Sequence, residues 1–300
     1  QANAFRATYP GCLAVGGDLI INDDDGMGND LINLDSLAGL TKVNGALGVY
    51  YNPLLTNLNP LQTITSVGGD ISIFQNELLP NLSGLSGLSR HASTFSVYEN
   101  NAMTTLNGIH NLTVFNNLNI YSNPLLTNLN GLANTDTING YFYLSNNDVL
   151  NDVSGLSSVN LIGSTFTISS NPALVSIREL TQLTSLSESL YITDNASLQN
   201  LDGLLFLESI SLDLYIDNNG ALSDYCGLYT IMDKEVNMGG TAIGGTITIT
   251  NNAIDPSPSD IVLNGPCGSI QNERTGQRYM SLQDAINDAD PMGTDTIIFL

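Results

Sequence analysis

Aromatic side chains that recur at a fixed interval are the residues of this chain best suited to binding a ligand. The flat faces of such rings stack on sugars, and tyrosine is common at protein interfaces. Aromatic pairs on neighbouring strands also stabilise a sheet, by about 0.2–1 kcal/mol each. A ligand-binding strip and a purely structural ladder are therefore both open interpretations. The recurring residues are Tyr50, Phe74, Tyr98 and Tyr121 at one position of an internal repeat, and Tyr143, Tyr191 and Tyr215 at a second position.

An acidic segment at residues 22–30 is the one place where the sequence suggests a metal ion. Its carboxylates are Asp23, Asp24, Asp25 and Asp30. Calcium favours clusters of oxygen ligands, but the EF-hand template would place Ile21 or Met27 at ligand positions. We expect a solvated acidic loop and keep a calcium site as the alternative. No other cofactor is indicated.

Groups that could perform catalysis are scarce. The two histidines, His91 and His110, do not have metal-ligand spacing, and we expect both at the surface near bends. The sequence has no glycine-rich phosphate loop, nucleophile elbow or paired zinc cysteines. Its carboxylates are scattered and do not single out a glycosidase pair. These features predict a protein that is not an enzyme.

Three cysteines bear on the ends of the repeat. Cys226 and Cys267 flank the segment that ends it, so a disulfide between them would fix a cap over the last copy. Closing such a loop contributes about 3–4 kcal/mol in the chain-entropy model. Two buried free thiols are the alternative. Cys12 has no evident partner and is expected to be a buried residue of the N-terminal cap.

The recurring aromatics belong to a repeat that runs from Val43 to about Leu228 and contains one asparagine per copy. Apolar residues precede this asparagine by five and three positions and follow it at intervals of three. Such a period is typical of a solenoid, in which neighbouring copies bury each other's apolar faces. The asparagines are 24 residues apart, with a single step of 23: Asn52, Asn76, Asn100, Asn123, Asn147, Asn171, Asn195 and Asn219.

The spacing also predicts the elements that position these residues. Apolar residues two apart, such as Phe142 and Leu144, indicate a short strand, and stacked copies would form a parallel sheet with strands about 4.8 Å apart. The aromatics lie two or four residues before the asparagine, so they should share the solvent face of that sheet. The asparagine lies where the strand bends inward, and its amide must pair with backbone groups of the turn. A glycine often follows eight residues later, where we expect a bend to need its conformational freedom: Gly84, Gly108, Gly131, Gly155 and Gly203.

The repeat, read for example from Leu47 and Val49 through Asn52 to Leu61, resembles the leucine-rich family. It is most similar to the receptor L-domain, a right-handed single-stranded β-helix, and to L-domain-like repeats of large secreted surface proteins of Bacteroidetes-type bacteria. The resemblance covers about residues 10–268. It implies a mostly β, leucine-rich-repeat-like solenoid of 24-residue turns with capped ends, and a role in recognition or adhesion at the cell surface.

The last thirty residues differ from the repeat. We expect a capped solenoid domain at residues 1–268 and the start of a second secreted domain at residues 270–300. The stretch from Ser281 to Ala289 predicts a helix, and that from Asp295 to Leu300 predicts a strand. This segment is similar to the opening of pectin-lyase-like parallel β-helix domains, so the chain is expected to be the front of a longer protein.

The composition of the chain limits the classes of partner that it can bind. With 29 acidic and 7 basic residues the net charge is -22, which disfavours nucleic acid and anionic membrane surfaces. No apolar run approaches the roughly 20 residues of a membrane span, so direct membrane insertion is not expected. We therefore predict a secreted, non-enzymatic module that binds a glycan or a cell-surface protein through the exposed face of its sheet. An ancillary N-terminal module of a secreted polysaccharide-degrading enzyme and a purely structural stalk are the alternatives.

Overall fold

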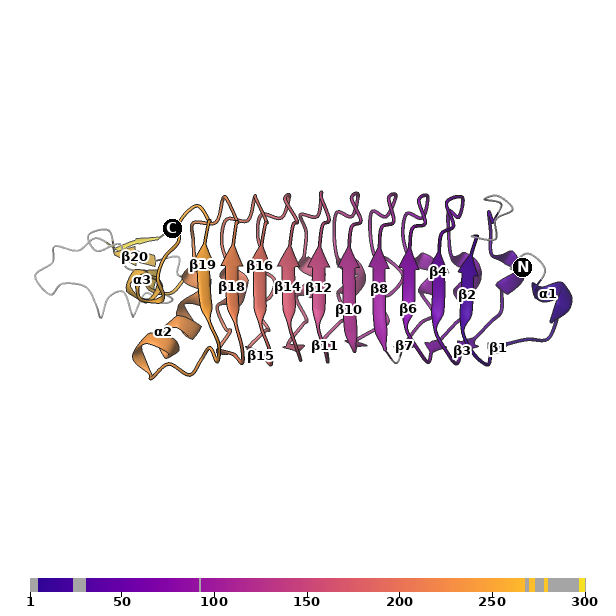
Figure 1. The fold of residues 1–300 in the computed structure, drawn as a ribbon, viewed down its shortest axis with the longest axis horizontal. Helices are drawn as coiled ribbons and strands as arrows, with labels where there is room; N and C mark the ends of the chain where they lie inside the picture. Colours follow the sequence, from indigo (N-terminus) through magenta and orange to yellow (C-terminus); the bar gives the residue numbers. More distant parts are fainter. Residues whose placement is uncertain are drawn as a thin grey trace, which may run out of the picture.

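The chain forms an elongated β-solenoid in which each turn lies beside the next along one axis (Figure 1). The computed structural model describes residues 5–23, 31–91, 93–267, 270–272, 278–279 and 297–299. Within these residues the regular structure is mainly strand and short 3-10 helix. The predicted fold class, a mostly β solenoid with turns of about 24 residues, is confirmed.

The main sheet consists, in the described part of the chain, of ten parallel strands, one from each turn. Neighbouring strands pair in register, so equivalent residues of successive turns lie side by side. The strands are β2 (Leu19–Asn22), β4 (Leu47–Tyr50), β6 (Ile71–Phe74), β8 (Thr94–Tyr98), β10 (Asn117–Tyr121), β12 (Phe142–Ser145), β14 (Phe166–Ser169), β16 (Leu190–Thr193), β18 (Leu214–Asp217) and β19 (Ile247–Thr250).

Two-residue strands form a second side of the solenoid and divide into two sheets. The first contains β1 (Ala14–Val15), β3 (Lys42–Val43), β5 (Ser66–Val67) and β7 (Arg90–His91). The second contains β9 (Val114–Phe115), β11 (Thr137–Ile138), β13 (Leu161–Ile162), β15 (Ser185–Leu186) and β17 (Ser209–Ile210). The interruption between β7 and β9 lies beside the 23-residue step. There, β8 and β10 pair over five residues of the main sheet, which lengthens the contact between the same two turns.

Short 3-10 helices form the third side and explain the three-residue spacing of the apolar positions. In a typical turn Leu58, Leu61 and Ile64 are buried in one continuous core. The 3-10 helices are η2 (Asp35–Leu37), η3 (Asn59–Leu61), η4 (Ser83–Leu85), η5 (Asn130–Leu132), η6 (Ser154–Leu156), η7 (Asp202–Leu204) and η8 (Cys226–Leu228). The core therefore runs the length of the solenoid, and each turn buries its apolar residues against its two neighbours.

The eight repeated asparagines are fully buried and bond to one another in a continuous series, which we call the asparagine ladder. Asn147 is representative: its Nδ2 donates to the carbonyl oxygens of Ile120 at 3.2 Å and Ser145 at 3.0 Å, and to Oδ1 of Asn171 at 3.2 Å. Its own Oδ1 accepts from the backbone N–H of Asn123 at 3.2 Å. The predicted pairing with backbone groups is confirmed, and Asn252 extends the series by accepting from the backbone N–H of Asn219.

The five glycines predicted eight residues after a ladder asparagine have a different role from the one expected. Only Gly108 has a positive φ, of 122°, so conformational freedom does not explain the other positions. A Cβ at Gly155 would lie 1.9 Å from the carbonyl oxygen of Leu129 in the preceding turn, and Gly84 and Gly203 have equally close contacts. At these glycines the requirement is steric, because the backbone of the preceding turn lies too close to leave room for a Cβ.

Helices and a disulfide close the C-terminal end. Helix α2 (Tyr229–Asn237) follows η8 and packs against α3 (Pro258–Asn264), which begins with a capping box between Ser257 and Asp260. The predicted disulfide between Cys226 and Cys267 is present.

At the other end, α1 (Phe5–Thr8) precedes β1, and Cys12 is half-buried against the core rather than buried.

Three strands of the final segment form a small antiparallel sheet: β20 (Ile270–Asn272), β21 (Arg278–Tyr279) and β22 (Ile297–Phe299). The last of these falls within the strand predicted at the end of the chain. The helix expected from Ser281 to Ala289 lies outside the described residues. The division into a solenoid domain and the start of a second domain stays a prediction.

Replacing Asn147 by Leu should lower the free energy of unfolding by about 3 kcal/mol, because buried backbone groups of two turns lose their partners. Asn151 is an exposed asparagine of the same turn, so Asn151→Ala should leave stability within about 0.5 kcal/mol of the native value. Chemical denaturation of both variants checks the difference. Equal stabilities would remove the role assigned to the ladder.

Replacing Gly155 by Ala should destabilise the solenoid by about 1–3 kcal/mol, since the new methyl group must displace the backbone of the preceding turn. Gly220 has no atom within 4 Å of a built Cβ, so Gly220→Ala is the matched control and should be nearly neutral. Thermal unfolding followed by circular dichroism compares the two. A neutral Gly155→Ala would mean that the neighbouring turns can separate at no cost.

Candidate functional site

Four aromatic rings on the outward face of the main sheet form a continuous stack, which we call the aromatic strip: Tyr50, Phe74, Tyr98 and Tyr121. The strip exists because β4, β6, β8 and β10 pair in register and bring these positions side by side. Successive ring centroids are 4.7, 4.6 and 4.5 Å apart, with interplanar angles of 16°, 6° and 6°. These distances are close to the separation of about 4.8 Å between neighbouring strands, and all four side chains are half-buried on the face where the sequence placed them.

The stacking limits how the strip can contact a ligand. Each inner ring has a neighbouring ring parallel to it on both sides, so its two faces are covered. A sugar therefore cannot stack flat on Phe74 or Tyr98, which corrects the expectation that binding would use the flat faces. The strip presents ring edges and the hydroxyl groups of its three tyrosines, which are hydrogen-bonding groups on an otherwise apolar surface.

Crowding in the strip raises the pKa of two of its tyrosines, Tyr98 and Tyr121. Burial raises the pKa of Tyr98 to about 12, with smaller contributions from the neighbouring Tyr121 and the carboxylate of Glu99. The pKa of Tyr121 is also raised, again mainly by burial. At neutral pH these hydroxyls can therefore both donate and accept hydrogen bonds.

The three remaining aromatics lie in a second row of the same face and do not continue the stack. Tyr143 meets Tyr121 edge-on, with centroids 5.8 Å apart and an interplanar angle of 69°. Tyr191 and Tyr215 form a separate tilted pair at 5.9 Å, and Thr167 stands between Tyr143 and Tyr191. The structure thus places all seven predicted residues on one face and brings five of them into contact as one group.

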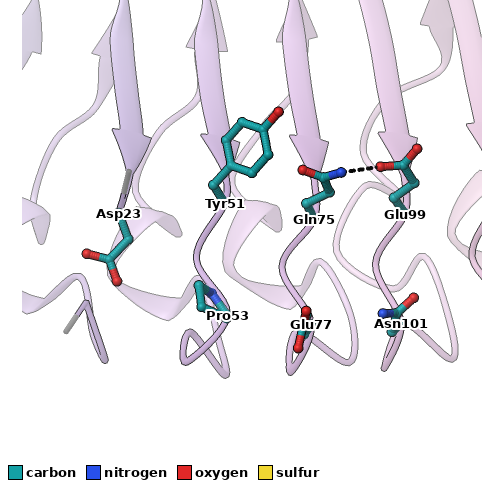
Figure 2. Close-up of a pocket in the computed structure, with 7 residues that line it drawn as sticks. All are labelled: Asp23, Tyr51, Pro53, Gln75, Glu77, Glu99 and Asn101. Carbon is teal, nitrogen blue, oxygen red and sulfur yellow. Dashed lines mark hydrogen bonds between the residues drawn. The ribbon is translucent and has the colours of Figure 1, made fainter. Parts of the chain in front are cut away.

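Beside the strip, the corner where the strands bend inward contains a pocket of about 750 Å³, which we call the corner pocket. Its described lining spans four turns: Asp23, Tyr51, Pro53, Gln75, Glu77, Glu99 and Asn101 (Figure 2). Gln75 Nε2 donates to Glu99 Oε2 at 2.6 Å and joins two of these turns. Tyr51 meets Tyr50 and Phe74 edge-on, at 5.6 and 5.3 Å, so the pocket and the strip adjoin.

Residues of this pocket adopt an unfavourable backbone conformation. In every turn the residue just before the asparagine has a positive φ, and at Tyr51, Gln75 and Glu99 the values are 58°, 52° and 54°. Asparagine and aspartate tolerate this conformation best. Several later turns use them there, at Asn146, Asp194, Asn218 and Asn251. The sequence pattern did not reveal the pocket because this residue belongs neither to the alternating strand nor to the core positions.

Most of the acidic segment proposed as a calcium site lies outside the described residues. Asp24, Asp25 and Asp30 lie outside them, and Asp23 is the one ligand candidate that is described. Its side chain is 6% exposed and accepts a hydrogen bond from the backbone N–H of Leu31 at 3.1 Å. This hydrogen bond joins the end of β2 to the segment that leads into η2.

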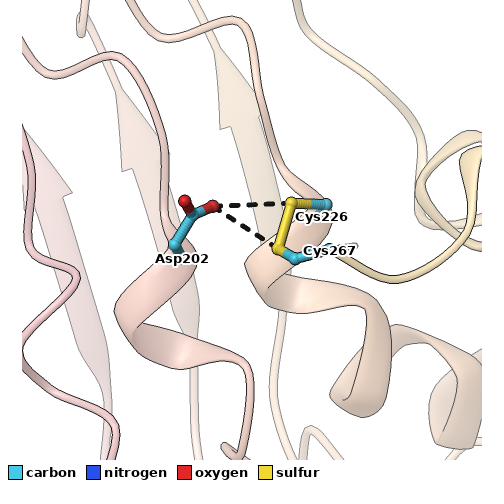
Figure 3. A group of neighbouring side chains, drawn as sticks. All are labelled: Asp202, Cys226 and Cys267. Atoms are coloured by element: carbon cyan, nitrogen blue, oxygen red, sulfur yellow. Dashed lines mark hydrogen bonds between the residues drawn. A yellow bond between two sulfur atoms is a disulfide. The ribbon is translucent and has the colours of Figure 1, made fainter. Parts of the chain in front are cut away.

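One cluster elsewhere has the composition of a metal site but not its chemistry. Asp202 Oδ1 lies 3.4 Å from the sulfurs of both Cys226 and Cys267 (Figure 3). These sulfurs are joined in the disulfide, so they carry no hydrogen to donate and cannot act as thiolate ligands. The carboxylate of Asp202 therefore lies against the disulfide between Cys226 and Cys267, where the C-terminal cap meets η7.

His91 is not the surface residue that was expected. It pairs in register with Val67 and therefore lies in a column of inward-facing residues, where its ring contacts Phe95 and Phe115. Both ring nitrogens are buried and form no hydrogen bond of good geometry. Burial lowers the pKa of His91, partly offset by backbone groups of Val114 and Ser93 and by the charge of Asp70. His110 is exposed, as expected.

Comparisons with protein-family models, with curated proteins and with solved structures found no match. The resemblance to receptor L-domains accordingly stays an expectation based on the repeat. Among the described residues, none of the helices has the length and apolar character that crossing a membrane requires.

Lowering the pH should destabilise the protein through His91. Its folded pKa is below the ordinary value of 6.5, so under acidic conditions the unfolded chain takes up the proton more readily, and stability falls as the pH drops through 6.5. His91→Leu should raise the free energy of unfolding by about 1–3 kcal/mol and flatten its pH dependence between pH 7 and 5. The exposed His110→Gln is the control. Denaturant titrations across this range that show parallel curves for native protein and His91→Leu would contradict the assignment.

Proposed function

We propose that this chain is a non-enzymatic extracellular binding module that recognises a protein or a glycan through the outward face of its main sheet. The aromatic strip is the observation that carries the proposal. Four rings aligned across four turns form a contiguous, partly exposed aromatic surface, and such surfaces are unusual on a monomer unless they contact something. The remaining aromatics of the second row extend this surface along the same face.

The strip is well prepared for binding. Its rings are held by stacking on neighbours and by strands that pair in register, so they lose little side-chain freedom when a partner docks. Tyrosine also combines a large contact area with a hydroxyl that can satisfy polar groups of the partner. These properties are those of a preformed interface on a rigid element rather than of a flexible loop.

The ring geometry favours a protein partner over a glycan. Sugar recognition by aromatics uses open ring faces, and the inner faces of the strip are covered. Ring edges and hydroxyls suit side chains and backbone groups of a protein surface, where tyrosines are frequent contact residues. The acidic charge of the chain further favours a partner surface that is neutral or basic. The disulfide is compatible with the extracellular location that we propose.

A structural role is the main rival, because the same stacking contributes to the stability of the sheet. Other turns of this chain show which substitution the fold tolerates at this position, so that the binding role and the structural role can be tested separately. Ser145 and Ser169 occupy the position of the strip residues in later turns, so serine is compatible with the fold at this position.

The double variant Tyr98→Ser/Tyr121→Ser should keep its fold and lose its partner. Native protein and variant are immobilised, incubated with a glycan array and with extracellular proteins, and compared quantitatively. Phe206→Ser removes an exposed aromatic from another part of the chain and is the control that should bind like the native protein.

One outcome of this experiment opposes the proposal, and another reverses the preference between the two partners. If the double variant melts at a lower temperature but retains every ligand of the native protein, the strip is a structural ladder. Loss of glycan ligands with protein ligands retained would instead reverse the preference for a protein partner.

A further inference from the structure

The corner pocket has a recognition chemistry that differs from that of the aromatic strip. Carboxylates of Asp23, Glu77 and Glu99 line it, together with the amides of Gln75 and Asn101, and its described lining includes no lysine or arginine. The two ion pairs of the described residues are formed elsewhere, by Arg178 with Glu179 and by Lys234 with Glu208. The negative charge of the pocket is therefore not balanced by any ion pair in the described part of the chain.

The ring of Tyr51 lies between the carboxylates of the corner pocket and the aromatic strip. Tyr51 is 45% exposed, and its ring is nearly perpendicular to those of Tyr50 and Phe74, with interplanar angles of 89° and 78°. It is not part of the parallel stack, so its ring remains accessible to a group that enters the pocket. A cation beside such a ring gains from the π-system as well as from the carboxylates.

The cost of building the pocket supports a binding role. Tyr51, Gln75 and Glu99 hold left-handed conformations that asparagine or aspartate would hold more easily, and four later turns have Asn or Asp there, while two have the small residues Ser122 and Ser170. Strained residues of this kind persist where their side chains are needed and where surrounding structure holds them in place. Here all three side chains project from the same corner and line one pocket (Figure 2).

We infer that the corner pocket binds the ammonium or guanidinium group of a lysine or arginine side chain, carried by the protein that the aromatic strip contacts. This inference rests on the proposed function, because the strip and the pocket share Tyr51 as a contact and form one surface. A carboxylate-lined pocket repels acidic sugars and phosphates, whereas a long basic side chain can place its charge between Glu77 and Glu99 while its methylene groups cover Tyr51.

The pocket is tested with small probes, which separates it from the strip. N-acetyl-arginine methylamide and N-acetyl-lysine methylamide are titrated into the protein at physiological salt, and binding is followed by NMR chemical-shift changes. The citrulline analogue has the shape of the arginine probe without its charge, and glucosamine represents an amino sugar. We expect the two basic probes to shift resonances of Tyr51, Gln75 and Glu99, and the citrulline analogue to bind at least about tenfold more weakly, the equivalent of 1.4 kcal/mol.

Two double variants with the same loss of charge test the location. Glu77→Gln/Glu99→Gln should weaken both basic probes about tenfold. Asp148→Asn/Asp194→Asn changes the equivalent positions of turns outside the pocket, one residue after and one before an asparagine of the ladder, and should bind like the native protein. Tyr51→Asn keeps a residue that tolerates positive φ and should also weaken the probes, with unchanged melting temperature.

Three outcomes overturn the inference, and a fourth overturns the proposed function instead. Equal weakening by both double variants would mean that the probes sense only the overall charge. Binding of the citrulline analogue as tight as that of arginine would exclude recognition of the cation, and binding of glucosamine alone would assign the pocket to a glycan. If the probes bind the pocket but Tyr98→Ser/Tyr121→Ser retains all partners, the inferred pocket chemistry stands and the proposed function fails.

Discussion

The corner at which each main strand ends imposes the constraint on which the rest of the molecule depends. A chain that turns inward there leaves backbone groups inside the core, where an unpaired N–H or C=O is costly. One asparagine per turn resolves this, since its amide donates to two carbonyls and its oxygen accepts from the preceding turn. No turn satisfies its own corner completely. Stability is therefore a property of neighbouring pairs of turns, as in other one-dimensional repeat proteins.

The same corner allows the candidate site to form without disturbing the core. Because the ladder fixes the backbone on both sides, the residue before each asparagine is held in a left-handed conformation whatever its side chain. This frees one outward position per turn from the demands of the core. Tyr51, Gln75 and Glu99 use that freedom to line a pocket, whereas four of the later turns place Asn or Asp there and two place Ser. Pocket and strip are thus products of one register, which aligns equivalent positions of neighbouring turns.

Much of this architecture could be predicted from the sequence, because period and residue type act locally. The buried asparagines, the strands and the face shared by the aromatics all follow from spacing, and the disulfide was expected from the place of its cysteines at the end of the repeat. The covered ring faces could not be predicted, since they depend on side-chain angles as well as on register. His91 was misplaced although a signal existed: it lies 24 residues from both Val67 and Phe115, which belong to a buried column. The role of Gly155 was missed because a close approach between turns leaves no trace in the residues of a single turn.

The interruption of the second side between β7 and β9 has a mechanical meaning. When a solenoid is pulled from its two ends, every boundary between turns carries the same load, and the weakest boundary yields first. At this boundary the short strands do not pair, but β8 and β10 gain a fifth paired residue and the stacked rings of Tyr98 and Tyr121 bridge the same two turns. Separation of these two turns would begin on the side of the short strands. The five paired residues of β8 and β10 and the stacked rings of Tyr98 and Tyr121 would resist it. The two turns would therefore bend about the β8–β10 strand pair before they separated.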